Sequence, residues 1–176
     1  MAVCAGFAGT FLQDKGLSFV YRFEAQNEAD TEKLAGVLAE RCVPGTVLAL
    51  DGDLGAGKTR FSQAMAAALG VRGAVNSPTF MIIKEYAGRL PFYHMDVYRI
   101  SPEEAEELGL EEYFYGDGVC AVEWAGVIAD LLPAERLECY IDVAGAGART
   151  FVLRPYGELY AGWCEELAER GVLARG

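Results

Sequence analysis

The sequence predicts a three-layer α/β protein, with a central, mainly parallel sheet that carries an inserted β-hairpin and antiparallel edge strands. Three observations lead to this prediction. The apolar run Thr46–Leu50 passes directly into a glycine-rich loop and an amphipathic segment, as a buried parallel strand passes into a helix. Residues 80–98 contain two strand-like runs around a short turn. Residues 137–143 alternate apolar with polar positions, which is typical of a strand with one solvated face.

Length and composition predict one domain. A chain of 176 residues can bury a substantial core, and its 52% hydrophobic and 23% charged residues are typical of a soluble globular protein. We expect residues 1–16 to form a flexible tail and residues 17–176 to form the domain. No apolar run approaches the length of a membrane span, and the first residues lack the basic start of an export signal. A cytoplasmic location is therefore expected.

The first part of the chain predicts a strand and two helices around the glycine-rich loop. Leu17–Phe23 is expected to be an edge strand, and Asn27 is suited to cap a helix that continues to about Cys42. Val43-Pro44-Gly45 then breaks that helix, and the helix after the loop should stop near Leu69–Gly70. The expected inner face of the first helix is Leu34, Val37, Leu38 and Cys42, and that of the second is Phe61, Ala64, Met65, Ala68 and Leu69.

The middle of the chain predicts a hairpin and a capped helix. Phe80–Tyr86 and Leu90–Tyr98 are expected to be strands on either side of a turn at Ala87–Arg89. In Ser101-Pro102-Glu103-Glu104 the serine can cap a helix, and the last glutamate can complete a capping box. Acidic residues continue to Glu112, and we interpret them as a solvated helix face rather than a metal cluster.

The last third predicts a buried strand, a helical turn, a strand pair and a final helix. Val119–Glu123 is expected to be a short buried strand that ends in a carboxylate, and a helix-like stretch runs from there to Leu132 and stops at Pro133. Residues 137–143 and 150–153 are expected to be strands joined by a turn of small residues. The C-terminal helix is expected to bury Leu159, Trp163 and Leu167.

The loop Gly52–Thr59, with the sequence GDLGAGKT, matches the P-loop pattern G-x-x-x-x-G-K-S/T at all four positions. Glycines let backbone N–H groups converge on an anion, and the following helix adds the positive end of its dipole. Lys58 supplies a mobile charge for the outer phosphates, and the Thr59 hydroxyl can bind Mg²⁺. A plain glycine turn is the alternative, but the strand before and the helix after favour nucleotide binding in a P-loop NTPase fold. The predicted nucleotide-binding segment is Gly52, Asp53, Leu54, Gly55, Ala56, Gly57, Lys58, Thr59 and Arg60.

Two carboxylates are candidates for the chemistry that a phosphate-binding loop cannot supply alone. Glu123 stands at the end of a predicted buried strand, where ligands of parallel sheets bind. Asp96 lies in the polar stretch HMDVYR at the end of another apolar strand, although a strand with one wet face would give the same pattern. Ser77–Phe80 could be a phosphate-sensing turn or an ordinary turn, and His94 could be a packing residue.

Cysteine content and net charge limit the classes of ligand and partner that the sequence predicts. The five scattered cysteines (Cys4, Cys42, Cys120, Cys139 and Cys164) and single histidine predict neither a disulfide framework nor a zinc site. A net charge of −11 disfavours tight direct binding of RNA and would suit a basic protein partner.

Several motifs together resemble one family. The ordered set is GDLGAGKT at Gly52, SPTF at Ser77, EY at Glu85, HMDVYR at His94 and VEW at Val122. In order and spacing this set resembles the TsaE family of bacterial P-loop ATPases, which are needed to form threonylcarbamoyladenosine in tRNA. The resemblance extends from about Asn27 to Arg154. Where that family often has proline or an acidic residue after the Glu-Trp pair, this chain has Ala125-Gly126.

The resemblance implies a function and two protein partners. In that family TsaD transfers a threonylcarbamoyl group to the adenosine next to the anticodon, and TsaE binds the TsaB–TsaD pair. Its ATP hydrolysis is thought to reset the complex between turnovers. The resemblance thus implies a Mg²⁺-dependent ATPase, weak alone and stimulated by TsaB and TsaD, that meets tRNA only indirectly.

The resemblance also implies roles for particular residues. Thr59 and Glu123 would bind Mg²⁺, and Asp96 would be a catalytic carboxylate beside Glu123 and Lys58. Arg149 would approach the nucleotide, and the helix start around Glu28 and Thr31 would lie near the adenine. Switch or neighbouring positions would be Ser77, Thr79, His94, Tyr98, Arg99 and Trp124.

Two other functions stay open at this point. A small-molecule kinase of the P-loop type would need an acceptor pocket and usually an arginine-bearing lid, whereas Arg89 and Arg99 are isolated. A nucleotide-sensing interaction protein with negligible turnover would signal through its bound state. A GTPase is disfavoured because the sequence has no N-K-x-D segment.

Overall fold

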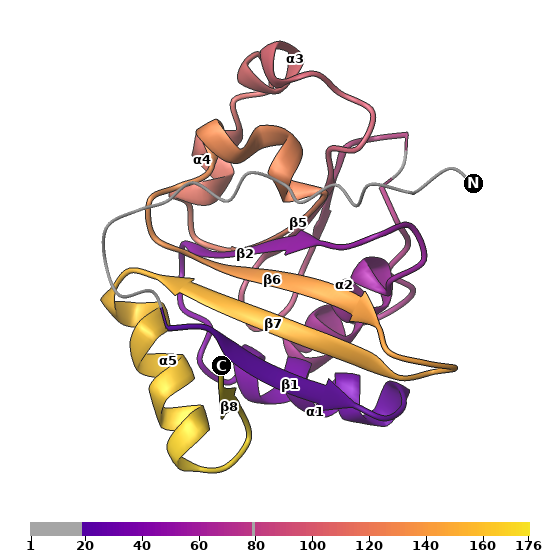
Figure 1. Cartoon of the computed structure of the whole chain (residues 1–176). Coiled ribbons are helices and arrows are strands. Elements are labelled where there is room, and N and C mark those ends of the chain that lie inside the picture. Colours follow the sequence, from indigo (N-terminus) through magenta and orange to yellow (C-terminus); the bar gives the residue numbers. More distant parts are fainter. Residues whose placement is uncertain (1–18, 79) are drawn as a thin grey trace, which may run out of the picture.

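The structure is a computed structural model that describes residues 19–78 and 80–176 (Figure 1). Its strands form one eight-stranded sheet in the order β3-β4-β5-β2-β6-β7-β1-β8. The strands are β1 (Tyr21–Ala25), β2 (Thr46–Asp51), β3 (Ile83–Tyr86), β4 (Phe92–Asp96), β5 (Val119–Glu123), β6 (Arg136–Val143), β7 (Arg149–Tyr156) and β8 (Ala174–Arg175). The helices are α1 (Glu28–Ala39), α2 (Lys58–Ala68), α3 (Pro102–Glu106), α4 (Leu110–Phe114), the 3-10 helix η1 (Ala125–Leu131) and α5 (Glu158–Glu169).

The sheet is mixed rather than mainly parallel, so that part of the predicted fold class is wrong. The four central strands β4, β5, β2 and β6 run parallel to one another through three pairings. The other four pairings are antiparallel. The chain between β6 and β7 is too short for the crossover that a parallel pair needs, so these strands form a hairpin. The predicted hairpin of β3 and β4 is confirmed, but β4 itself extends the parallel part of the sheet.

Helices cover both faces of the sheet, which confirms three layers. α1, α2 and α5 pack with one face of β2, β5 and β6, where Leu48, Ala121 and Cys139 lie. α3, α4 and η1 pack with the other face, around Val47 and Val122. Three residues predicted to be buried are exposed instead: Ala68, Val143 and Leu159. Periodicity in the sequence shows which residues share a face of a helix or strand, but not where the buried part of that face ends.

Local signals in the sequence set most element boundaries. The side chain of Asn27 accepts a hydrogen bond from the backbone of Asp30 at the start of α1. Ser101 and Glu104 form the predicted capping box at α3. Gly109, with φ 64°, separates α3 from α4, a break that the sequence analysis missed. The first helix ends at Ala39, earlier than predicted.

Some predictions lie outside the described residues: the flexible tail at residues 1–16, the start of the first strand at Leu17, Cys4 and Thr79. Of the cysteines that the structure describes, Cys42, Cys120, Cys139 and Cys164 are buried free thiols. Across residues 19–78 and 80–176 no cluster of three metal-binding side chains occurs. In the same residues, every helix is too short or too polar to cross a membrane.

Candidate functional site

The glycine-rich loop connects β2 to α2 at the carboxyl end of the parallel strands. Gly52 cannot be replaced without a shift, because a Cβ there would lie 2.3 Å from the carbonyl oxygen of Ile141. Gly57 precedes α2 with φ 110°, a conformation that favours glycine, and provides no side-chain cap. The first N–H groups of α2 therefore have no capping side chain at Gly57, which is the arrangement that binds anions.

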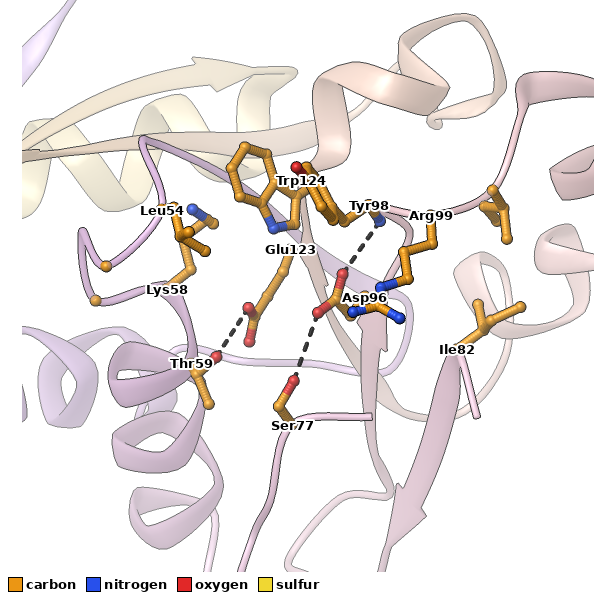
Figure 2. Close-up of a pocket in the computed structure, with 13 residues that line it drawn as sticks. Leu54, Lys58, Thr59, Ser77, Ile82, Asp96, Tyr98, Arg99, Glu123 and Trp124 are labelled. Atoms are coloured by element: carbon orange, nitrogen blue, oxygen red, sulfur yellow. Dashed lines mark hydrogen bonds between the residues drawn. The ribbon is translucent and has the colours of Figure 1, made fainter. Parts of the chain in front are cut away.

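A cavity of about 430 Å³ opens beside this loop (Figure 2). The loop, the ends of β4 and β5 and the segment before β3 all contribute to it. Its lining residues are Leu54, Gly55, Gly57, Lys58, Thr59, Ser77, Ile82, Asp96, Tyr98, Arg99, Ile100, Glu123 and Trp124. Eleven of these thirteen belong to the predicted site; Gly55 and Gly57 are among them, and the other nine are labelled in Figure 2. Ile82 and Ile100 were missed, and Leu54 projects almost fully into solvent with 87% exposure.

Lys58 is buried inside its own loop. Its ammonium donates to the carbonyl oxygens of Gly52 at 2.5 Å and Asp53 at 3.0 Å, and it lies 3.7 Å from the ring centre of Trp124. Burial lowers the pKa of Lys58, while the charges of Glu123 and three aspartates act in the opposite direction. The result is a cation in the lining of the cavity, held against the ring of Trp124.

Glu123 joins α2 to the neighbouring strand. One oxygen, Oε2, accepts a hydrogen bond of 3.0 Å from the hydroxyl of Thr59, and the other, Oε1, lies 2.6 Å from Nε2 of His94. Glu123 and His94 are both buried, with 2% and 0% exposure. The interaction between Glu123 and Thr59 is drawn in Figure 2.

Asp96 lies directly beside Glu123, because the two residues are register partners on the parallel strands β4 and β5. Its carboxylate accepts from the backbone N–H of Tyr98 at 3.1 Å and, weakly, from the hydroxyl of Ser77 at 3.4 Å. Two carboxylates from adjacent strands therefore face one cavity, as the positions of these residues at strand ends predicted. Ser77 brings the segment before β3 to the same point.

Two residues on the cavity wall have unusual backbone conformations. Ile82 and Trp124 both have φ 61°, and they are the only non-glycine residues with positive φ in the described chain. Side chains, and β-branched ones above all, are strained there. The ring of Trp124 packs 4.5 Å from that of Tyr98, which holds both aromatic groups at the edge of the cavity.

Arg149 and Arg60 lie outside the cavity lining. Arg149 donates to the carbonyl oxygen of Ala56 at 2.6 Å and thus braces the glycine-rich loop from β7. Arg60 bonds to Glu28 and Glu32 of α1 instead, at 3.1 and 2.7 Å. Six other members of the predicted site also do not line the cavity: Gly52, Asp53, Ala56, Glu28, His94 and Thr31, the last being buried in α1.

Asp51, which the sequence analysis missed, supports the loop that follows Trp124. Its carboxylate accepts from the N–H of Gly126 at 3.0 Å, and a Cβ on Gly126 would lie 3.4 Å from it. Burial raises the pKa of Asp51, although the hydrogen bond from Gly126 acts in the opposite direction. The Ala125-Gly126 departure from the resembled family is thus accommodated by a direct contact. The signal in the sequence that could have identified Asp51 is its position immediately before the glycine-rich loop.

Together, the fold and site define a mixed α/β protein with a cavity where a strand passes through a glycine-rich loop into a helix. Both negatively and positively charged side chains line that cavity. Residues 25–151 match the family model described as "Threonylcarbamoyl adenosine biosynthesis protein TsaE". The chain belongs to the TsaE family, which is involved in tRNA threonylcarbamoyladenosine biosynthesis. The matched range includes every predicted site residue from Glu28 to Arg149.

Individual relatives agree with the family model. The chain is 50% identical over 148 residues to a tRNA threonylcarbamoyladenosine biosynthesis protein TsaE of Bacillus subtilis (strain 168), covering 84% of this chain and 93% of that protein. It is 38% identical over 129 residues to the protein of the same name from Treponema pallidum (strain Nichols), covering 73% and 96%. A crystal structure of YdiB from Bacillus subtilis is similar with a TM-score of 0.77 at 43% identity, covering 89% of this chain and 99% of that one.

Proposed function

We propose that this chain is a Mg²⁺-dependent ATPase with a P-loop NTPase fold, and that it acts on a TsaB–TsaD complex to reset it between turnovers. The observation that carries the proposal is the meeting of four groups in one cavity: the Lys58 ammonium, the Thr59 hydroxyl and the carboxylates of Asp96 and Glu123. Phosphoryl transfer depends mainly on positioning and charge, and these are the groups that supply both.

The glycine-rich loop is suited to the phosphates. The start of α2 offers N–H groups and a helix dipole to an anion, and Gly57 lets the backbone turn toward it. Lys58 donates to two carbonyl oxygens of its own loop, and phosphate oxygens would be stronger acceptors for its charge. Arg149 would act on the nucleotide through the loop carbonyl that it holds, rather than by direct contact.

The donor atoms fit magnesium. Thr59 Oγ1 and Glu123 Oε2 are both oxygens, they lie 3.0 Å apart, and no third protein ligand is needed where phosphates complete the coordination. When bound there, Mg²⁺ neutralises charge on the phosphates. Asp96, beside Glu123, is then the carboxylate that can orient an attacking water.

Other parts of the site serve secondary roles in this proposal. Ser77 connects the segment before β3 to Asp96, so that segment can respond to what the cavity holds. Glu28 and Thr31, at the start of α1, are proposed to lie near the adenine, with Arg60 tied to Glu28. The net charge of −11 favours docking on protein, with tRNA contacted by the partners in the cytoplasm.

The test is ATP hydrolysis by the purified chain, with and without TsaB–TsaD, beside a Lys58→Ala control. We expect weak activity alone, strong stimulation by the partners and loss in the control. Turnover that is negligible even with bound partners would favour the nucleotide sensor. Transfer of phosphate to a small acceptor instead of water would favour the kinase. Strong, salt-sensitive binding of tRNA by the isolated chain would contradict the docking scheme.

A further inference from the structure

His94 is a fully buried polar residue whose position packing alone does not explain. It lies in the middle of β4, at 0% exposure, and its ring is 6.2 Å from that of Phe92 on the same face of the sheet. An apolar side chain would fill this place without a polar atom. Nδ1 of His94 has no hydrogen-bond partner among the described residues, which is a cost that a core position normally avoids.

The other ring nitrogen identifies what the histidine does. Nε2 lies 2.6 Å from Oε1 of Glu123, and a carboxylate can only accept, so the imidazole donates. Oε2 of the same carboxylate accepts from Thr59 at 3.0 Å. The two oxygens of Glu123 therefore have different partners, one on α2 and one on β4, and the carboxylate cannot rotate without losing one of them.

We propose that His94 is a positioning residue that holds the Glu123 carboxylate with Oε2 toward Thr59, and so sets the geometry of the cation site. This inference rests on the proposed function, because it assigns the cation to the Thr59 and Glu123 oxygens. Residues behind metal ligands orient them in this way, and their loss reduces metal affinity by about 10–100-fold. The donor atom is Nε2, so only a side chain that reaches that point can replace it.

Glutamine and asparagine provide a matched pair for the test. The amide nitrogen of Gln can occupy about the position of Nε2, whereas that of Asn reaches only about the position of Nδ1. The variants His94→Gln and His94→Asn are similarly polar, and His94→Leu removes the donor altogether. Phe92→Leu, which alters a buried neighbour on the same face, is the packing control.

The readout is the effect of Mg²⁺ on ADP affinity, measured by calorimetry on the full chain in Mg²⁺ and in EDTA, with a thermal melt of each variant. We expect the ratio of the two dissociation constants to fall about 10-fold or more in His94→Asn and His94→Leu. His94→Gln should recover most of the ratio. ADP affinity in EDTA should hardly change in any of them, and Phe92→Leu should lower the melting temperature without changing the ratio.

Equal ratios in His94→Gln and His94→Asn would overturn the proposal, whether both were normal or both reduced, because a packing role does not distinguish the two nitrogens. This comparison stays decisive if His94→Leu fails to fold. A wild-type chain without any effect of Mg²⁺ on ADP binding would overturn the proposed function and this inference together. Normal coupling in the wild type and in His94→Asn would overturn only the role of His94.

Discussion

The two halves of the sheet are built differently. On β6, β7, β1 and β8 every buried residue is apolar. The other half consists of β3, β4, β5 and β2, together with the glycine-rich loop that follows β2. It buries three ionisable side chains, those of Lys58, His94 and Glu123. Both strained residues, Ile82 and Trp124, also belong to this half and line its cavity.

This difference separates stability from chemistry. The antiparallel half agrees with the local rules of folding, with apolar residues inside and only glycine at positive φ. The other half departs from those rules at the cavity and directly behind it, and its remaining buried polar strand residue, Thr46, donates a hydrogen bond to the carbonyl oxygen of Val43. Buried charge and backbone strain persist only where the surrounding structure holds them, and they concentrate at functional sites. The antiparallel half provides part of the support that holds them.

The largest expected effect lies in the antiparallel half. Leu153→Ala, at a fully buried position of β7, should lower the free energy of unfolding by about 2–5 kcal/mol. Its folded fraction should bind nucleotide with normal affinity, because Leu153 does not line the cavity. Denaturant unfolding and calorimetry measure the two quantities. Val143→Ala, at an exposed site of β6, is the control, and a large loss of affinity in Leu153→Ala would mean that the halves are coupled.

In the other half, Lys58→Ala should reduce nucleotide affinity while leaving the fold intact. Nucleotide affinity should fall by about 10²-fold or more, because a preorganised charge in a site shielded from water is lost. The fold should remain, as a far-ultraviolet spectrum would verify. Lys33→Ala removes an equal charge from an exposed site on α1 and should leave affinity unchanged. Normal nucleotide affinity in Lys58→Ala would contradict the assignment of nucleotide binding to this half of the sheet.

A smaller effect tests the strain. Ile82 and Ile83 are adjacent isoleucines of intermediate burial, but only Ile82 has positive φ. Because the left-handed conformation costs a side chain about 1–2 kcal/mol, Ile82→Gly should be less destabilising than Ile83→Gly by about that amount. Chemical denaturation of both variants measures the difference. Equal losses would show that the strain at Ile82 is negligible.

The smallest effect is a pH dependence. The folded-state pKa of Asp51 is raised above 3.8, chiefly by burial. Below pH 3.8 the carboxyl group of Asp51 is protonated in both the folded and the unfolded state. As the pH rises from there toward the folded-state pKa, the unfolded state loses its proton first, so Asp51 lowers the stability of the wild type. Asp51→Asn does not titrate and can still accept from Gly126. It should therefore gain stability over the wild type across that window, as urea unfolding from pH 3 to 7 would measure.

Local patterns predicted much of this molecule. The apolar run that ends in Glu123 is β5, residue for residue, and the glycine pattern marked the loop and the start of α2. Caps at Asn27 and Ser101 have mechanisms that operate within four residues, so they could be predicted from the sequence.

Contacts between distant residues could not be predicted in this way. The pairing of His94 with Glu123 depends on the register of β4 against β5, which no local pattern fixes. Trp124 and Ile82 are ordinary strand or turn residues by composition, and their positive φ arises from the tertiary structure. The number of antiparallel pairings was underestimated for the same reason, since pairing direction is a property of two strands.

Arg149 connects the loop to a part of the surface that can be reached with a reporter. The chain between β6 and β7 is exposed at Gly145, Ala146 and Gly147, only a few residues before the arginine that holds the Ala56 carbonyl. Every cysteine of residues 19–78 and 80–176 is buried. A fluorophore on Ala146→Cys, in a Cys4→Ser background, would therefore signal when the loop fills, without any label in the cavity.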